Sequence, residues 1–219
     1  VVQAAKAAGV RRIVLISFLR ARPNCGSAYH ESKWAAEEIV RNSGLDYTIL
    51  KCGMIYGRGD HMLDHLSHAL FTLPLFATVG VREKPIRPAP IEDLLEVMHA
   101  ALLNERLSGV TAFVTGAEEL YLSQAVRRVA SVVNKRVFVL PTPVWFHYLL
   151  AHIFELIMRV PLIALAQVRI LQEGAVDAAP PCDPLPEDLQ PRRWFTPDLI
   201  RTGLPEPGPF GLRDLGCSS

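Results

Sequence analysis

The sequence lacks an excess of charge of either sign. Its 219 residues include 23 Lys and Arg against 22 Asp and Glu, which gives a formal net charge of +1. Such a balance creates no strong field to attract a polyanion, so we expect no nucleic-acid partner and do not favour a membrane surface as partner. Half of the residues are apolar, which is enough for a sizeable core. We therefore expect a globular protein.

Cysteine is scarce. The four residues, Cys25, Cys52, Cys182 and Cys217, form neither a C-x-x-C pair nor an even framework, so neither a zinc site nor a disulfide scaffold is indicated. We expect no bound metal and a reducing, cytoplasmic compartment, with a membrane-peripheral location as the alternative. The chain begins at Val1 rather than Met, and we therefore expect that the natural start and any targeting signal are missing.

Long uninterrupted apolar runs are also missing. The most apolar stretch lies between Pro143 and Pro161 and is shorter than the roughly 20 residues that cross a bilayer. Four polar residues close to one helical stripe interrupt it: His147, His152, Glu155 and Arg159. We expect a buried amphipathic helix here, with an interfacial membrane helix as the alternative.

Helix and strand patterns alternate through the first part of the chain. Residues 1–10 are helix formers closed by Gly9, and residues 12–17 form a β-branched apolar run typical of a strand covered on both faces. Residues 28–42 then favour a helix and residues 45–53 a strand. This order predicts the α/β class, with a parallel sheet and right-handed crossovers.

The later segments continue the alternation and then change in character. We expect further helices at 61–73, 91–104 and 121–134, and strands at 111–116 and 136–143. Residues 141–175 are strongly apolar and predict a small helical lobe. Residues 176–219 are rich in proline and predict a wrapping, partly ordered tail.

Three polar residues near the first strand form a candidate catalytic group. Tyr29 and Lys33 are four positions apart on the predicted helix, so their side chains lie on one face. A lysine ammonium beside a phenol stabilises the phenolate and lowers its pKa from about 10 toward neutrality. Ser17, at the end of the preceding strand, could bond the same substrate oxygen. The pattern predicts acid–base chemistry on a carbonyl or alcohol at the carboxyl edge of a parallel sheet, although Tyr-x-x-x-Lys is by itself common.

A family resemblance follows from four stretches in order over residues 1–140. They are "AAKAAGVRRIVLIS", "SAYHESKWAAEEIVRNSGLDYTILKCGMIYGRGD", "RPAPIEDLLEVMHAALLN" and "GVTAFVTGAEELYLSQAVRRVASVVNKRV". Together they resemble the carboxy-terminal two-thirds of an atypical or extended short-chain dehydrogenase/reductase, of the epimerase/dehydratase or NmrA-like kind. The closest-looking branch is the group of the 39 kDa-type complex I subunit.

The resemblance implies a fold and residue roles. It implies the carboxy-terminal half of a Rossmann-type NAD(P)-binding sheet over residues 1–140, with a small, mostly helical substrate lobe. Tyr29 matches the acid/base tyrosine, Lys33 the lysine that also binds the nicotinamide ribose, and Ser17 the strand-end serine. The backbone of Gly53, Met54 and Ile55 would approach the nicotinamide of NAD or NADP. Bulky residues after Ser17 and a Lys51-Cys52 pair in place of arginine-proline depart from the family pattern.

The same resemblance implies two functions and one large absence. The first function is an NAD(P)-dependent oxidoreductase or epimerase that acts on a carbonyl or alcohol of a small-molecule substrate. The alternative is a non-catalytic NAD(P)H-holding accessory or assembly subunit. The glycine-rich turn that binds the cofactor pyrophosphate has no counterpart in the sequence, which predicts that about four amino-terminal strands are missing. Residues 12–17 would then be an exposed sheet edge, and a partner protein could cover that edge or the apolar helix.

Overall fold

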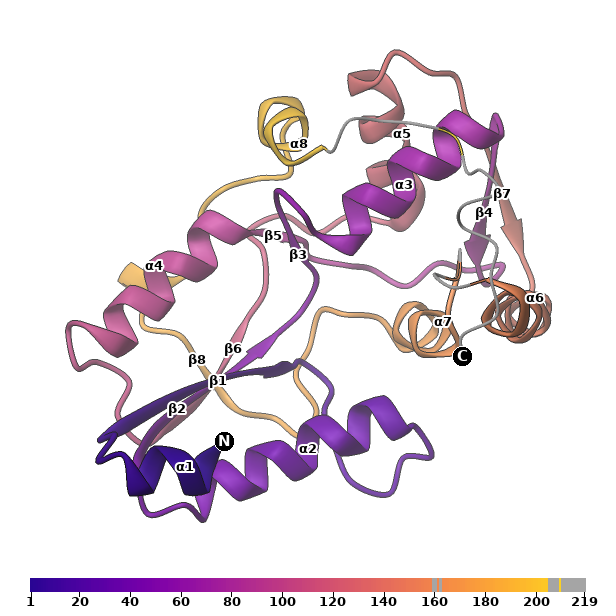
Figure 1. Ribbon diagram of the computed structural model, residues 1–219. Helices are drawn as coiled ribbons and strands as arrows, with labels where there is room; N and C mark the ends of the chain where they lie inside the picture. Colours follow the sequence, from indigo (N-terminus) through magenta and orange to yellow (C-terminus); the bar gives the residue numbers. More distant parts are fainter. Residues whose placement is uncertain (159–160, 162, 205–208, 210–219) are drawn as a thin grey trace. The chain divides into compact units, whose positions relative to one another are not determined.

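The computed structural model describes residues 1–158, 161, 163–204 and 209. The chain divides into two compact units, each assembled from separate stretches (Figure 1). Unit 1 contains Val1–Ile55, Arg87–Ala117 and Val176–Trp194. Unit 2 contains Tyr56–Ile86, Glu118–Ala175 and Phe195–Ser219.

Unit 1 is built on a four-stranded parallel sheet. The strands lie in the order β1 (Arg12–Phe18), β2 (Asp46–Cys52), β6 (Val110–Val114) and β8 (Asp183–Pro184). All three pairings are parallel, which confirms the α/β class. Among the described residues, β1 has a strand on one side only, so the predicted edge position of this strand is also confirmed.

Helices cover both faces of this sheet. Side chains alternate along a strand, so Leu50 and Cys52 face one side while Lys51 faces the other. The first side packs against α4 (Ile91–Leu102) through a shared apolar core that includes Leu94 and Val97. The second side is covered by α2 (Ala28–Arg41), which Figure 1 draws below the sheet. The short helices α1 (Val2–Ala7) and η1 (Glu187–Leu189) complete the unit.

Unit 2 contains a two-stranded parallel sheet surrounded by helices. The strands are β4 (Leu75–Val79) and β7 (Phe138–Thr142). The helices are α3 (His61–Thr72), α5 (Leu122–Val132), α6 (Val144–Ile157), α7 (Leu165–Glu173) and α8 (Pro197–Gly203). A second pair of short strands, β3 (Ile55–Tyr56) and β5 (Ala89–Pro90), occurs where the chain passes between the sequence ranges of the two units.

The apolar segment after residue 143 does form a helix, but the predicted burial of its apolar side chains is wrong for five of them. His147, which the sequence places in a polar stripe, is buried, together with Ala151. The exposed residues of this helix include the predicted His152 and Glu155, but also five large apolar ones: Trp145, Leu149, Ile153, Leu156 and Ile157. Arg159 lies outside the described residues. Among the helices that the structure describes, none combines the length and the hydrophobicity needed to cross a bilayer.

The Pro-rich tail is divided between the two units. Residues 176–194 belong to unit 1, where Asp183–Pro184 extends the sheet as β8. Thr196 caps α8, whose first helical residue is Pro197, a position where a missing N–H carries no cost. The remainder of the predicted tail, residues 205–208 and 210–219 with Cys217, lies outside the described residues.

Candidate functional site

The loop before α2 fixes the start of the candidate helix. Its turn requires a left-handed backbone at Asn24 and Gly26, with φ of 52° and 71°. The Glu31 carboxylate accepts the N–H groups of Cys25 and Gly26 at 2.9 and 2.8 Å. This acid in the first turn complements the helix N-terminus and ties the loop back to α2. Tyr29 is therefore held on the opening turn, just beyond the carboxyl end of β1.

The environment of Tyr29 differs from the one the sequence suggests. Its ring packs 5.4 Å from the ring of Phe18 and 5.7 Å from that of His30, and 38% of the residue is exposed. Burial, and then the nearby Cys52 thiol, raise the pKa of Tyr29 above its usual value. The expected lowering by Lys33 is not seen. A phenol with a raised pKa stays protonated at neutral pH, as an unshifted phenol does, and is a weaker acid than an unshifted one.

Lys33 lies one turn after Tyr29 on α2. Its Nζ donates a long hydrogen bond of 3.5 Å to the carbonyl oxygen of Ile16 at the edge strand. An ammonium has three donors, and this single long contact leaves capacity for a ligand hydroxyl. Lys33 also opposes the effect of burial on Cys52, whose pKa burial raises to about 12. The structure thus brings Tyr29, Lys33 and Cys52 into one neighbourhood at the carboxyl end of β1 and β2.

Ser17 is placed differently from the other two predicted residues. Its side chain is buried and its hydroxyl donates to Glu37 on the inner face of α2. In the sheet register Ser17 lies beside Lys51 of β2. The hydroxyl is therefore engaged beneath the helix, and its assignment to the substrate oxygen stays a prediction.

A buried charge cluster surrounds Glu37, and sequence reasoning missed it. The Glu37 carboxylate, which is fully buried, accepts from Arg41 at 2.8 Å and lies 3.6 Å from Lys51 Nζ. Burial lowers the pKa of Lys51, while the charge of Glu37 acts in the opposite direction. Lys51 also donates to the carbonyl of Ala21 at 2.9 Å. Two features of the sequence could have indicated this cluster: Lys51 lies inside an apolar strand, and Glu37 and Arg41 are four residues apart on the helix.

The segment after β2 was predicted to approach a nicotinamide. Part of its backbone is already engaged, because Gly53 N–H donates to Val114 at 2.9 Å and Met54 C=O accepts from Ala89 at 2.8 Å. Gly53, Met54 and Ile55 are half-buried. Their cofactor role stays a prediction.

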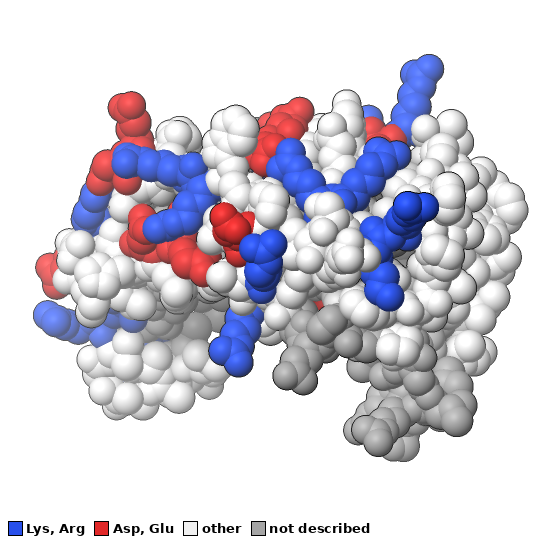
Figure 2. All heavy atoms as spheres, turned by 90° about the horizontal axis from the view of Figure 1, so that it is seen from above, with Lys and Arg blue, Asp and Glu red and all other residues white. Residues whose placement is uncertain are grey.

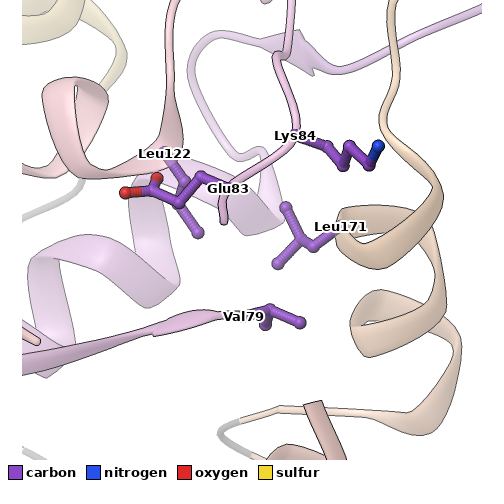
Figure 3. Close-up of a pocket in the computed structure, with 5 residues that line it drawn as sticks. All are labelled: Val79, Glu83, Lys84, Leu122 and Leu171. Atoms are coloured by element: carbon purple, nitrogen blue, oxygen red, sulfur yellow. The ribbon is translucent and has the colours of Figure 1, made fainter. Parts of the chain in front are cut away.

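Each unit contains a cavity apart from this site. In unit 1, an open cavity of about 380 Å³ lies beside the Glu37 cluster and is lined by residues that include Trp34, Arg41, Lys51 and Cys182. In unit 2, a pocket of about 10 Å³ has room for roughly one water. Figure 3 shows Val79, Leu122 and Leu171 around this pocket, with the charged ends of Glu83 and Lys84 directed away from it. Tyr29 and Lys33 line neither cavity.

No metal centre is found among residues 1–158, 161, 163–204 and 209: no three His, Cys, Asp or Glu side chains gather there as a ligand set. His61 and His65 stack on α3 with ring centroids 6.0 Å apart, and His68 pairs with Asp64 at 3.3 Å. These contacts account for the helical spacing of the three histidines.

Comparison with known proteins gives one family match. Residues 1–65 match a family described as NAD(P)H-binding. The matched region is the amino-terminal third of the chain and is shorter than the 1–140 range on which the resemblance was based. It nevertheless contains Ser17, Tyr29, Lys33 and Gly53.

Among relatives with known names, the chain is 25% identical over 217 residues to NADH dehydrogenase [ubiquinone] 1 alpha subcomplex subunit 9, mitochondrial, of Rattus norvegicus. That alignment covers 99% of this chain and 50% of the rat protein, so the chain spans about half the length of this relative. The mouse protein of the same name is also 25% identical, over 157 residues, with 71% and 41% coverage.

Solved structures with the same fold include two enzymes. A nucleoside-diphosphate-sugar epimerase from Staphylococcus aureus has a TM-score of 0.65 at 16% identity, covering 91% of this chain and 68% of that one. An NADPH-dependent quinone oxidoreductase from Escherichia coli has a TM-score of 0.58 at 21% identity, covering 76% and 55%. These likenesses show an α/β Rossmann-like fold with parallel sheets. With the family match and the distant relationship to subunit 9, they confirm the resemblance drawn from the sequence.

Proposed function

We propose that this chain, a relative of the atypical short-chain dehydrogenases/reductases with an NAD(P)H-binding segment at residues 1–65, is the nicotinamide-side part of an NAD(P)-dependent oxidoreductase or epimerase. The observation that carries the proposal is the position of Tyr29 and Lys33. Both lie on the first turns of α2, just beyond the carboxyl end of the parallel strand β1. In open parallel sheets, ligands bind at this edge.

In the proposed mechanism Tyr29 acts as the proton donor. A phenol carries its proton at neutral pH, and the partial exposure of Tyr29 lets the hydroxyl reach a substrate oxygen. A nicotinamide held there would supply hydride to a carbonyl carbon, and the Tyr29 hydroxyl would give its proton to the carbonyl oxygen, which would become an alcohol. Lys33 would bind the ribose hydroxyls and replenish the proton. These residues fit the cofactor because the Lys33 ammonium retains donor capacity beside Tyr29.

The substrate class follows from the same chemistry. The substrate needs a carbonyl or alcohol that can exchange a proton with a phenol and a hydride with a nicotinamide. Sugar nucleotides and quinones both meet this requirement. The two similar solved enzymes carry those substrates in their names. We propose that the four-stranded sheet of unit 1 corresponds to the carboxy-terminal part of a complete NAD(P)-binding domain, and that unit 2 supplies the substrate lobe.

A second candidate function is a non-catalytic NAD(P)H-holding accessory or assembly subunit. Two observations favour it: Ser17 donates to Glu37 rather than standing open to a substrate, and the rat relative is named as a subunit of a larger complex. In this alternative the Tyr29–Lys33 pair holds the nicotinamide ribose without turnover. The two candidates agree on binding and differ only on chemistry.

The Tyr29→Phe variant of the complete natural protein tests the proposal. Loss of the proton donor should lower turnover by roughly 10²-fold or more, because packing is kept while general acid catalysis is removed. Cofactor affinity should change little. Oxidation of NADH and of NADPH would be followed with a panel of quinones and sugar nucleotides, and cofactor binding by calorimetry.

Tyr148→Phe is the matched control, since it removes a phenol hydroxyl that bonds Gln172 on α7 in unit 2. Its turnover should equal that of the wild type. Unchanged turnover in Tyr29→Phe would remove Tyr29 from the mechanism. Tight cofactor binding without turnover on any substrate of the panel would support the accessory subunit instead.

A further inference from the structure

A buried carboxylate outside the proposed mechanism holds helix α2 on its sheet. The charged side chains that Figure 2 shows on one face of the molecule stand at the surface, whereas Glu37 is fully buried. Glu37 accepts the hydroxyl proton of Ser17 on β1 and lies 3.6 Å from Lys51 Nζ on β2. Ser17 and Lys51 are partners in the register of the two strands. One carboxylate therefore fastens α2 to β1 and β2 at the same level.

The candidate site lies on the same side of α2 as this anchor. Tyr29, Lys33 and Glu37 follow one another at four-residue spacing, which places them along one side of a helix. Ser17 and Lys51 are each the last residue but one of their strand, so the anchor is close to the carboxyl edge where ligands bind. The polar contact of Lys33 with β1 is an exposed bond of 3.5 Å, a distance at which a hydrogen bond restrains little. The placement of the candidate pair therefore depends on the anchor further along the helix.

The bond from Ser17 to Glu37 also limits what this hydroxyl can do. A serine hydroxyl carries one proton, and here Glu37 accepts it. Arg41, at 2.8 Å, and Lys51 place positive charge beside the carboxylate and favour its ionised form, which can only accept hydrogen bonds. Ser17 therefore retains lone pairs but has no second proton for a substrate oxygen.

We propose that Glu37 is a positioning residue of the candidate site. Through α2 it sets the placement of Tyr29 and Lys33, and it commits the Ser17 proton, so that Tyr29 is the donor to the substrate oxygen. This role rests on the proposed function and deepens it. A displacement of about 1 Å at a reacting group can cost on the order of 10²-fold in rate, so an anchor one or two turns away affects turnover.

Glu37→Leu with Lys51→Met in the complete natural protein removes the anchor. The change replaces a buried ion pair by apolar side chains of similar size, which proteins often tolerate, and Arg41 keeps Glu38 as a partner. Turnover should fall roughly tenfold or more. In a Tyr29→Phe background the same change should cost about threefold or less, because the group that Glu37 positions is absent.

Cofactor affinity gives a second readout, which needs no turnover. Calorimetric titration of NADH and NADPH into the Glu37→Leu, Lys51→Met protein should show binding weakened roughly threefold or more, because Lys33 would lose its place beside the ribose. A Lys33→Ala background should remove this loss. Glu38→Gln is the matched control, since it removes an exposed carboxylate that pairs with Arg41 on the same helix. It should leave turnover and affinity at wild-type values.

Folding of every variant is checked by circular dichroism. If the Leu and Met pair fails to fold, Glu37→Gln, which keeps the size of the side chain, takes its place and should show the same coupling at a smaller size. Equal losses with and without Tyr29 or Lys33 would mean that Glu37 only stabilises the fold and would overturn the proposal, as would wild-type turnover and affinity without the anchor. Wild-type turnover in Tyr29→Phe alone would refute the proposed function and, with it, the role of Glu37 toward Tyr29.

Discussion

Helices α2 and α6 have the same length, 14 residues each, but they use their faces in opposite ways. Helix α2 buries Glu37 and His30 against its sheet. Helix α6 also buries a polar side chain, His147, but turns its tryptophan, leucines and isoleucines outward. A simple rule of apolar inside and polar outside describes neither helix.

The difference depends on what the strand below each helix offers. Under α2, Lys51 of β2 and Ser17 of β1 pair with Glu37, so burial of the acid is compensated. Under α6, Thr142 and the carbonyl of Ala77 reach His147 at 3.2 and 3.4 Å. In the described part of the chain, the five outward apolar side chains of α6, from Trp145 to Ile157, stay exposed. A helix periodicity therefore defines its stripes, but the neighbouring strand determines which stripe faces inward.

The largest effect that would test this comparison is expected at Glu37. Glu37→Gln leaves Lys51 and Arg41 beneath α2 without their shared carboxylate, and loss of one member of a buried pair costs about 3–5 kcal/mol. The free energy of unfolding should fall by that amount in urea denaturation. Glu38→Gln is the matched control, since Glu38 pairs with the same Arg41 from an exposed position and should cost less than about 1 kcal/mol. Equal losses would mean that the Glu37 cluster is no more buried than a surface pair.

The main elements of the sheet could be predicted from the sequence because their signals are local. The runs at 12–17 and 45–53 contain β-branched residues between turn signals, and the observed strands are Arg12–Phe18 and Asp46–Cys52. Gly9 does adopt a left-handed conformation, with φ of 71°, after α1 ends at Ala7. Strands β4 and β8 were missed, because their strand state depends on pairing with distant residues of β7 and β6.

The candidate site was predictable to a smaller extent. The i,i+4 spacing of Tyr29 and Lys33 was visible in the sequence, and both lie on α2 as expected. The hydroxyl of Ser17 could not be placed, because its orientation depends on Glu37, twenty positions away in the sequence. The raised pKa of Tyr29 was also out of reach, since it arises from burial of the phenol and from Cys52 on strand β2. Interactions that depend on tertiary contacts produce no periodic pattern in the sequence.

A smaller effect is expected from the protonation of Lys51. Burial lowers the pKa of Lys51 in the folded chain below its unfolded value of about 10.4, so between these two values the unfolded state binds more protons. The contribution of Lys51 to stability therefore rises with pH through that window. The free energy of unfolding of the wild type and of Lys51→Met would be measured at neutral pH and near pH 10. The difference between them should move in favour of the wild type at the higher pH. A difference that does not vary with pH would contradict burial of this amine.

The smallest effect is expected on the outward face of α6. Leu156→Ser removes an apolar side chain that is 77% exposed, so the free energy of unfolding should change by no more than about 0.5 kcal/mol. Leu94→Ser on α4, where the leucine is 2% exposed, is the matched control and should cost at least about 2 kcal/mol, because it opens a cavity in the unit 1 core. Thermal denaturation of both variants gives the change in the free energy of unfolding for each. A loss at Leu156 as large as that at Leu94 would show that another part of the chain covers α6, and the comparison of the two helices would then fail at its outer face.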